Sequence, residues 1–108
     1  MSVTCEVRTE TAYTDATVFV RGEVDIYTAP VLRAELLATV NSGAAHLTVD
    51  LTATSFMDST GIGVLVTSLK AMRARGGTMH LRGIGVPLRH ALELTGLDQV
   101  FEIVPSTS

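Results

Sequence analysis

The segment VDLTATSFMDSTGIGVLV, residues 49–66, carries the pattern that decides the fold. A short apolar run over residues 47–51 is typical of a buried strand, and a polar turn follows it. Beyond the turn, apolar residues recur at helical spacing as far as the Gly76-Gly77 pair, where a helix is expected to end. The pattern therefore predicts a strand, a loop and a helix that begins near the sequence DSTG at residues 58–61.

This expected helix start is a candidate site for a negatively charged group. A helix N-terminus exposes unpaired backbone N–H groups and the positive end of the helix dipole, so a phosphate on Ser59 could be held by backbone donors. The same residues also have a purely local interpretation, because Asp58 or Ser59 can cap the helix by accepting a hydrogen bond from an N–H two or three positions on. Thr60 is a second possible phosphate acceptor, but we assign its hydroxyl to orienting the loop.

Two features of the segment favour a functional role over a simple cap. Phe56-Met57 is an apolar pair between polar neighbours. Gly61 and Gly63 fall at the beginning of the helix, where each glycine costs roughly 0.5–1 kcal/mol relative to alanine. A helix start that carries this cost indicates that something large approaches its backbone closely.

The spacing also assigns the faces of this helix. Ile62, Val66 and Leu69 form the expected core stripe. The side left for a docking partner then carries Gly63, Val64 and Thr67. One outward valine is normal on any protein surface, so the spacing alone leaves the role of Val64 open.

The composition describes one folded domain over residues 1–108, with a short tail at 105–108. A hydrophobic fraction of 46% excludes a disordered chain, and a net charge of −3 without a basic cluster argues against direct nucleic-acid binding. The sequence has neither an apolar stretch of about 18 residues nor a signal peptide, so we expect a cytoplasmic protein without a membrane span. Cys5 is alone and the histidines are scattered, so we expect no disulfide, metal site or cofactor.

The N-terminal part predicts a hairpin and a helix. Residues 3–9, from Val3, alternate as a half-buried edge strand, and residues 17–21 form its partner after a turn at 13–16. A helix of about 13 residues is expected after Thr28 as N-cap. Asp25 lies between the second strand and this helix, where its carboxylate can either form a turn or an N-terminal cap before the helix, or line a partner surface beside Ser59.

The rest of the chain continues the alternation of strands and helices. The strand at residues 46–51 is expected to be interior and apolar on both faces. Further elements are expected as a strand at 78–82, a helix from Val86-Pro87 to Gly96, and a strand at 100–104. The order ββαβαβαβ predicts an α/β fold with a mixed, mostly parallel five-stranded sheet, whose functional loops gather at the carboxyl ends of the strands.

The order of elements and three motifs together resemble the STAS domain, and within it the bacterial anti-sigma factor antagonists. The matching segments are GEVD at 22–25 with YTAP at 27–30, FMDSTGIGVL at 56–65, and LTGL at 94–97. The resemblance runs over nearly the whole chain. Members of that family commonly continue into a further helix, whereas this sequence ends at Ser108, soon after the last expected strand.

The resemblance implies a partner switch. In that family the serine that here is Ser59 is phosphorylated by the partner anti-sigma factor, a serine kinase. The unphosphorylated antagonist captures this kinase and frees a sigma factor, and a metal-dependent serine phosphatase resets the phosphorylated form. The implied partner surface consists of Asp25, Tyr27, Asp58, Thr60, Gly61, Gly63 and Val64. No enzymatic activity is implied, and we expect a monomer or a weak dimer.

Two other functions compete with this interpretation. A STAS subunit can act as a scaffold in a stress-signalling or transporter assembly, and gel filtration would then show a large self-assembly. A hydrolase with Ser59 as nucleophile would need a nearby base, but the sequence has no Gly-x-Ser-x-Gly elbow and places no histidine near Ser59. We therefore expect a binding protein and not an enzyme.

Overall fold

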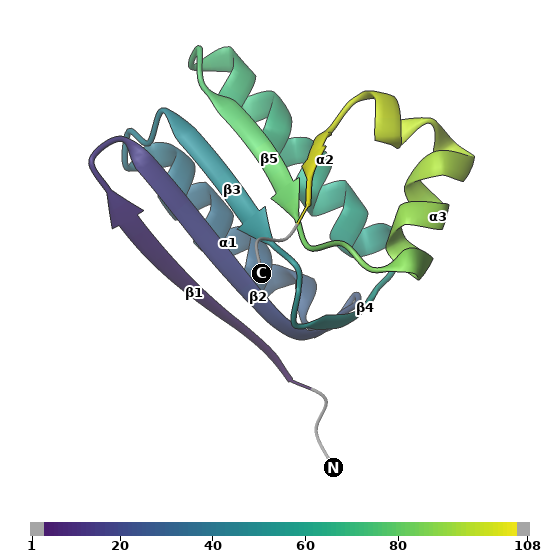
Figure 1. Cartoon of the computed structure of the whole chain (residues 1–108). Coiled ribbons are helices and arrows are strands. Elements are labelled where there is room, and N and C mark those ends of the chain that lie inside the picture. Colours follow the sequence, from purple (N-terminus) through teal and green to yellow (C-terminus); the bar gives the residue numbers. More distant parts are fainter. Residues whose placement is uncertain (1–3, 106–108) are drawn as a thin grey trace.

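The structure, a computed structural model, describes residues 4–105. Val3, the expected start of the first strand, and residues 106–108 of the expected tail lie outside this range. The elements, labelled in Figure 1, are β1 (Cys5–Ala12), β2 (Asp15–Val24), α1 (Ala29–Asn41), β3 (His46–Asp50), β4 (Thr54–Met57), α2 (Ser59–Ala74), β5 (Thr78–Arg82), α3 (Val86–Thr95), a short 3-10 helix η1 (Leu97–Gln99) and β6 (Glu102–Val104).

The sheet is mixed and mostly parallel, as predicted. Its strands follow the order β1-β2-β3-β5-β6, and β4 pairs with β2 outside this path. Only the β1–β2 pair is antiparallel among the described strands. The five predicted strands form the main path, whereas β4 falls in a stretch for which the sequence predicts a loop.

Strand β2 pairs with two successive strands along the same edge. Its first half pairs with β3, and its last residues pair with β4 after a register shift between Gly22 and Glu23. Gly22 has a φ of +100°, and a Cβ there would lie 2.2 Å from the carbonyl oxygen of Thr4, so the position requires glycine. As a result β2 and β4 end side by side, with Val24 opposite Met57.

The helices α1 and α2 cover one face of the sheet (Figure 1), and the hydrophobic core lies between these two layers. Leu47 and Val49 of β3 point into this core and are fully buried, while Thr48 and Asp50 alternate with them and are only half-buried. The expectation that β3 is apolar on both faces was therefore wrong, because no helix among the described residues packs on the opposite face in Figure 1.

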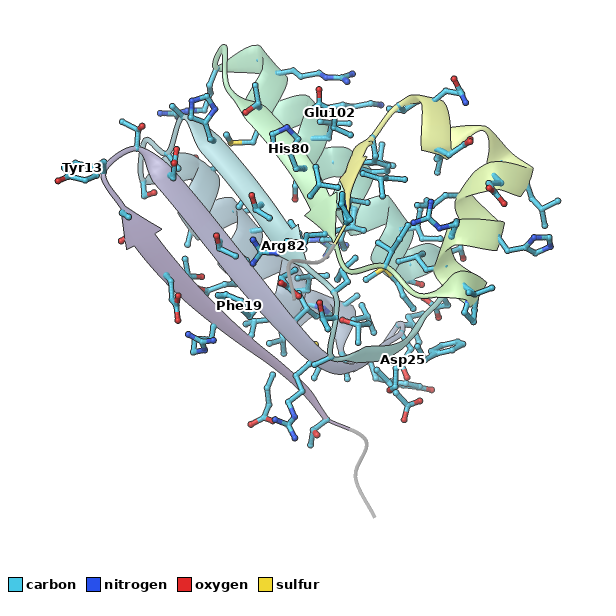
Figure 2. The ribbon with its side chains drawn as sticks, viewed as in Figure 1. Tyr13, Phe19, Asp25, His80, Arg82 and Glu102 are labelled. Atoms are coloured by element: carbon cyan, nitrogen blue, oxygen red, sulfur yellow. The ribbon has the colours of Figure 1, made fainter. Side chains whose placement is uncertain are left out.

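The open face of the sheet is held together by charged and aromatic side chains. Figure 2 shows Phe19 and Arg82 on this face, and the guanidinium of Arg8 lies 4.3 Å from the centre of the Phe19 ring. Arg82 Nε donates a hydrogen bond of 2.8 Å to Asp50 Oδ2. Burial alone raises the pKa of the Asp50 carboxyl, but hydrogen bonds from Thr52 and the pairing with Arg82 outweigh it and lower this pKa overall.

The three predicted helices are present, but the buried face of α2 differs from the prediction. The first helix has the expected 13 residues, and the third ends at Gly96 with a left-handed φ of +76°. In α2, however, Val64 is only 3% exposed and belongs to the core, so its expected outward position was wrong. Helix α2 packs on α1 as well as on strands, so its buried face is wider than a single stripe. No helix within residues 4–105 is long and apolar enough to cross a membrane.

Candidate functional site at the ends of β2 and β4

Two neighbouring parallel strands end at the same place and each leads into a helix. The Asp58 N–H donates a hydrogen bond of 3.1 Å to the Val24 carbonyl, so Asp58 follows β4 directly beside the end of β2. Asp25, labelled in Figure 2, follows Val24 at this edge. Burial, and then the negative charge of Asp25, raise the pKa of the Cys5 thiol at the start of β1. The predicted gathering of both loops at the carboxyl ends of the strands is confirmed.

Asp25 shapes the loop that enters α1. Its Oδ1 accepts hydrogen bonds from the N–H groups of Tyr27 and Thr28, at 2.9 and 3.0 Å. Thr28 occupies the N-cap position as predicted, but its hydroxyl makes no cap and instead donates to the Glu23 carbonyl at 2.7 Å. The local interpretation of Asp25 is thus confirmed, and its contact with a partner stays a prediction.

Asp58 caps α2 in the same way. Its Oδ1 accepts hydrogen bonds from the N–H groups of Thr60 and Gly61, at 2.9 and 3.3 Å. These two donors are therefore occupied in the unmodified protein, and the binding of a phosphate by backbone donors at this helix start stays a prediction. Thr60 contributes its N–H to this cap, whereas its hydroxyl makes no hydrogen bond within residues 4–105 and does not orient the loop.

Ser59 is the first residue of α2 and is exposed. Among the described residues no hydrogen bond engages its hydroxyl, and no acidic side chain follows in the first turn of the helix. His46, His80 and His90 lie on β3, β5 and α3, and none of them forms a hydrogen bond to Ser59 in the described part of the chain. The Ser59 hydroxyl is therefore free for an enzyme that approaches from solvent.

The two glycines at the start of α2 have different surroundings. A Cβ on Gly61 would lie 2.6 Å from Met57 Cγ and 2.7 Å from Val24 Cγ1, so Gly61 is needed where the helix packs on the strands. A Cβ on Gly63 would meet nothing within 4 Å, and Gly63 is exposed. The close approach expected at Gly61 is thus made by Met57 and Val24 of the same domain. Packing within the domain does not explain why residue 63 is a glycine.

Comparisons with known proteins identify the family to which this fold belongs. A family model described as the STAS domain matches residues 6–108. This chain belongs to the STAS domain family. It is 38% identical over 104 residues to the anti-sigma-B factor antagonist of Listeria monocytogenes, covering 95% of this chain and 90% of the relative. It is also 38% identical over 89 residues to the anti-sigma-B factor antagonist of Bacillus subtilis, covering 82% and 81%.

A solved structure gives the same assignment. The crystal structure of an anti-sigma factor antagonist from Mycobacterium paratuberculosis superimposes with a TM-score of 0.88 at 28% identity, covering 95% of this chain and 87% of that one. The predicted resemblance to the anti-sigma factor antagonists is therefore confirmed, and with it a family of regulatory binding proteins.

In this STAS domain, exposed apolar side chains surround the candidate site. Ile26 and Tyr27, in the loop before α1, are 67% and 87% exposed, and Phe56 on β4 is 50% exposed. We call these three residues the apolar rim. Tyr27 was predicted from the family resemblance, whereas Ile26 was missed, although Ile26-Tyr27 is an apolar pair in a loop just as Phe56-Met57 is.

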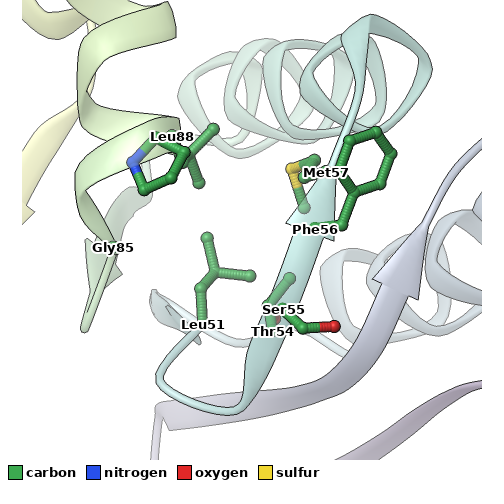
Figure 3. A pocket seen from close by; sticks show the side chains of 8 residues that line it. Leu51, Thr54, Ser55, Phe56, Met57, Gly85 and Leu88 are labelled. Carbon is green, nitrogen blue, oxygen red and sulfur yellow. The ribbon is translucent and has the colours of Figure 1, made fainter.

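Beside the apolar rim the STAS domain has a pocket of about 340 Å³ between β4 and the start of α3 (Figure 3). Leu51 and Met57 line one side of this pocket and Leu88 lines the other. Phe56 also borders this pocket, although in Figure 3 its ring lies on the other side of β4 from Met57 and Leu88.

Proposed function

We propose that this STAS domain is an anti-sigma factor antagonist whose binding to its anti-sigma factor is switched off by phosphorylation of Ser59. The anti-sigma factor is the serine kinase that modifies Ser59, and a metal-dependent serine phosphatase resets the switch. The observation that carries this proposal is the exposed and unbonded hydroxyl of Ser59 at the beginning of α2, between two capped loops.

The apolar rim supports a protein partner. Aromatic side chains that become fully buried in an interface, tyrosine among them, often supply much of its binding energy. Tyr27, Ile26 and Phe56 offer such contacts around a polar centre formed by Ser59 and the carboxylates of Asp25 and Asp58. A folded partner that covers the rim therefore also covers Ser59.

Phosphorylation then acts through charge. A phosphoserine adds about −1.5 to −2 charges beside Asp58 and near Asp25. The Asp58 carboxylate already accepts the helix-start N–H groups of Thr60 and Gly61, so these donors do not stabilise the new anion. The interface must instead desolvate the phosphate among like charges. A loss of about 3 kcal/mol would weaken binding roughly a hundredfold, which is sufficient for a switch without refolding of the domain.

Mass spectrometry of the intact protein tests the proposal directly. After incubation with ATP and a candidate kinase, we expect a gain of roughly 80 Da that maps to the peptide containing Ser59. Ser59→Ala should remain unmodified and bind the kinase, and Ser59→Asp should fold normally but bind weakly. Thr60→Ala is the matched control, because it removes the neighbouring hydroxyl without breaking a hydrogen bond of the described chain. Full phosphorylation of Ser59→Ala would refute the assignment.

A further inference from the structure

We propose that the free edge of β1 pairs with β1 of a second copy of this chain, which joins the two sheets in an antiparallel dimer. Strand β1 is the first strand of the sheet and pairs only with β2 among the described elements. It has eight residues and contains no proline. An uninterrupted edge strand is a template for pairing with another chain. The proposal involves no phosphorylation and stands independently of the function of Ser59.

The hydrogen-bond pattern shows which residues of β1 face the free edge. The Glu23 N–H donates to the Thr4 carbonyl at 3.3 Å, so these two residues form a hydrogen-bonded pair of the β1–β2 ladder. The next pair is Cys5 opposite Gly22. The Gly22 N–H donates to the Ala53 carbonyl, on the side of β2 that faces away from β1. In an antiparallel ladder bonded and non-bonded pairs alternate. The N–H and C=O groups that point outward therefore belong to Cys5, Val7, Thr9 and Thr11.

The charges on β1 are complementary to themselves in one antiparallel register. The exposed side chains alternate as Glu6, Arg8 and Glu10, and the half-buried side chains on the other face include Val7. When Val7 is placed opposite Val7 of the second copy, Arg8 of each copy lies opposite Glu6 of the other. The outward groups of Cys5 then meet those of Thr9 in the second copy, so the backbone pairs are satisfied as well.

The neighbouring registers fit less well. If Arg8 is placed opposite Arg8 of the second copy, two arginines meet, and Glu6 of each copy lies opposite Glu10 of the other. This register brings like charges together on the same face of the sheet. If Thr9 is the centre, Arg8 meets Glu10 of the second copy, which gives as many Arg–Glu pairs as the Val7 register, but two threonines and not two valines then face each other on the other side of the strand. The register centred on Val7 therefore combines opposite charges with an apolar contact between the two valines.

Sedimentation of the whole chain over a range of concentrations tests the dimer. We expect the mass to rise from that of one 11.5 kDa chain towards twice that value. Val7→Pro removes an outward N–H without breaking the β1–β2 ladder, so the variant should remain monomeric, with a lower melting temperature because Val7 also packs against the core. Val7→Thr is the matched control, because it keeps the N–H and a β-branched side chain and should still associate.

A charge exchange tests the register. Glu6→Arg alone and Arg8→Glu alone should each weaken association about tenfold, because like charges then face each other across the dimer. The double variant Glu6→Arg/Arg8→Glu should restore it. A monomer at every concentration, a dimer unaffected by Val7→Pro, or a double variant that stays dissociated would each overturn the proposal. The single-site charge variants keep the test decisive if Val7→Pro fails to fold.

Discussion

Alanine substitutions at Gly61 and Gly63 form a matched pair, because the two residues lie in the same stretch of α2 but differ in what surrounds them. Both substitutions remove the conformational freedom of glycine from a helix, which alone stabilises the folded state by roughly 0.5–1 kcal/mol. At Gly63 the added methyl group meets nothing within 4 Å. We therefore expect Gly63→Ala to raise the free energy of unfolding by about that amount.

At Gly61 the contacts of the added methyl group reverse the sign of the effect on stability. The added Cβ would lie 2.6 Å from Met57 Cγ and 2.7 Å from Val24 Cγ1, and both distances require atoms to move. Val24 is fully buried and cannot move without disturbing the core, whereas the Met57 side chain can adjust. Overpacking of this kind costs about 1–3 kcal/mol. After the helix gain is subtracted, we expect Gly61→Ala to lower the free energy of unfolding by up to about 2.5 kcal/mol.

Urea unfolding of the wild type and both variants measures this difference. The midpoints should shift in opposite directions, with similar slopes because the exposed surface changes little. A thermal scan should show a difference of several degrees, since about 1 kcal/mol corresponds to roughly 4–8 °C in a domain of about 100 residues. Shifts in the same direction would refute the packing argument. If the partner's chain lies against Gly63, the more stable Gly63→Ala variant should also bind the kinase more weakly.

Two further predictions concern the hydrogen bonds of polar side chains that hold the fold together. Because the pKa of Asp50 is lowered in the folded state, its stabilisation is present above the unfolded value of about 4 and is lost as the pH falls through the folded pKa. Asp50→Asn, which leaves Arg82 without its carboxylate, should cost about 1–3 kcal/mol at pH 7 in urea unfolding, and the difference from wild type should vanish in strong acid. Thr28→Val removes the hydrogen bonds of a buried hydroxyl to Glu23 and Asp25. We expect it to lower the free energy of unfolding by about 1–3 kcal/mol, with a matching fall in the melting temperature. An unchanged melting temperature would contradict this role of Thr28.

Features set by neighbouring residues were predicted well from the sequence. Strand β5 has the predicted bounds, and Gly96 ends α3 as expected, because both depend on short-range patterns. The positions of Asp25 and Asp58 at strand ends were also predicted, since they follow from the order of elements. The local roles of Asp25 in a turn and of Asp58 as a helix cap were among the alternatives that the sequence left open, because such roles and partner contact need the same residue types.

Features that depend on distant segments were not predicted. Strand β4 has only four residues, and its pairing requires the register shift at Gly22, which no local pattern indicates. The burial of Val64 depends on α1 packing beside α2, so the spacing within α2 alone could not determine it. In β3, by contrast, the alternation of Leu47 and Val49 with polar residues already indicated one covered face, and the assumption about interior parallel strands outweighed that signal.

The register shift at Gly22 has a consequence for any search for mutations that abolish signalling. A Cβ at this glycine would lie 2.2 Å from the Thr4 carbonyl oxygen of β1, at the point where β2 begins to pair with β4 and where Ser55 of β4 has no partner residue on β2. A larger residue there would push β2 away from β1 just before the two helix-entry loops, without touching Ser59 itself. Such a mutant would look like a defect in recognition, although its cause would be a displaced strand.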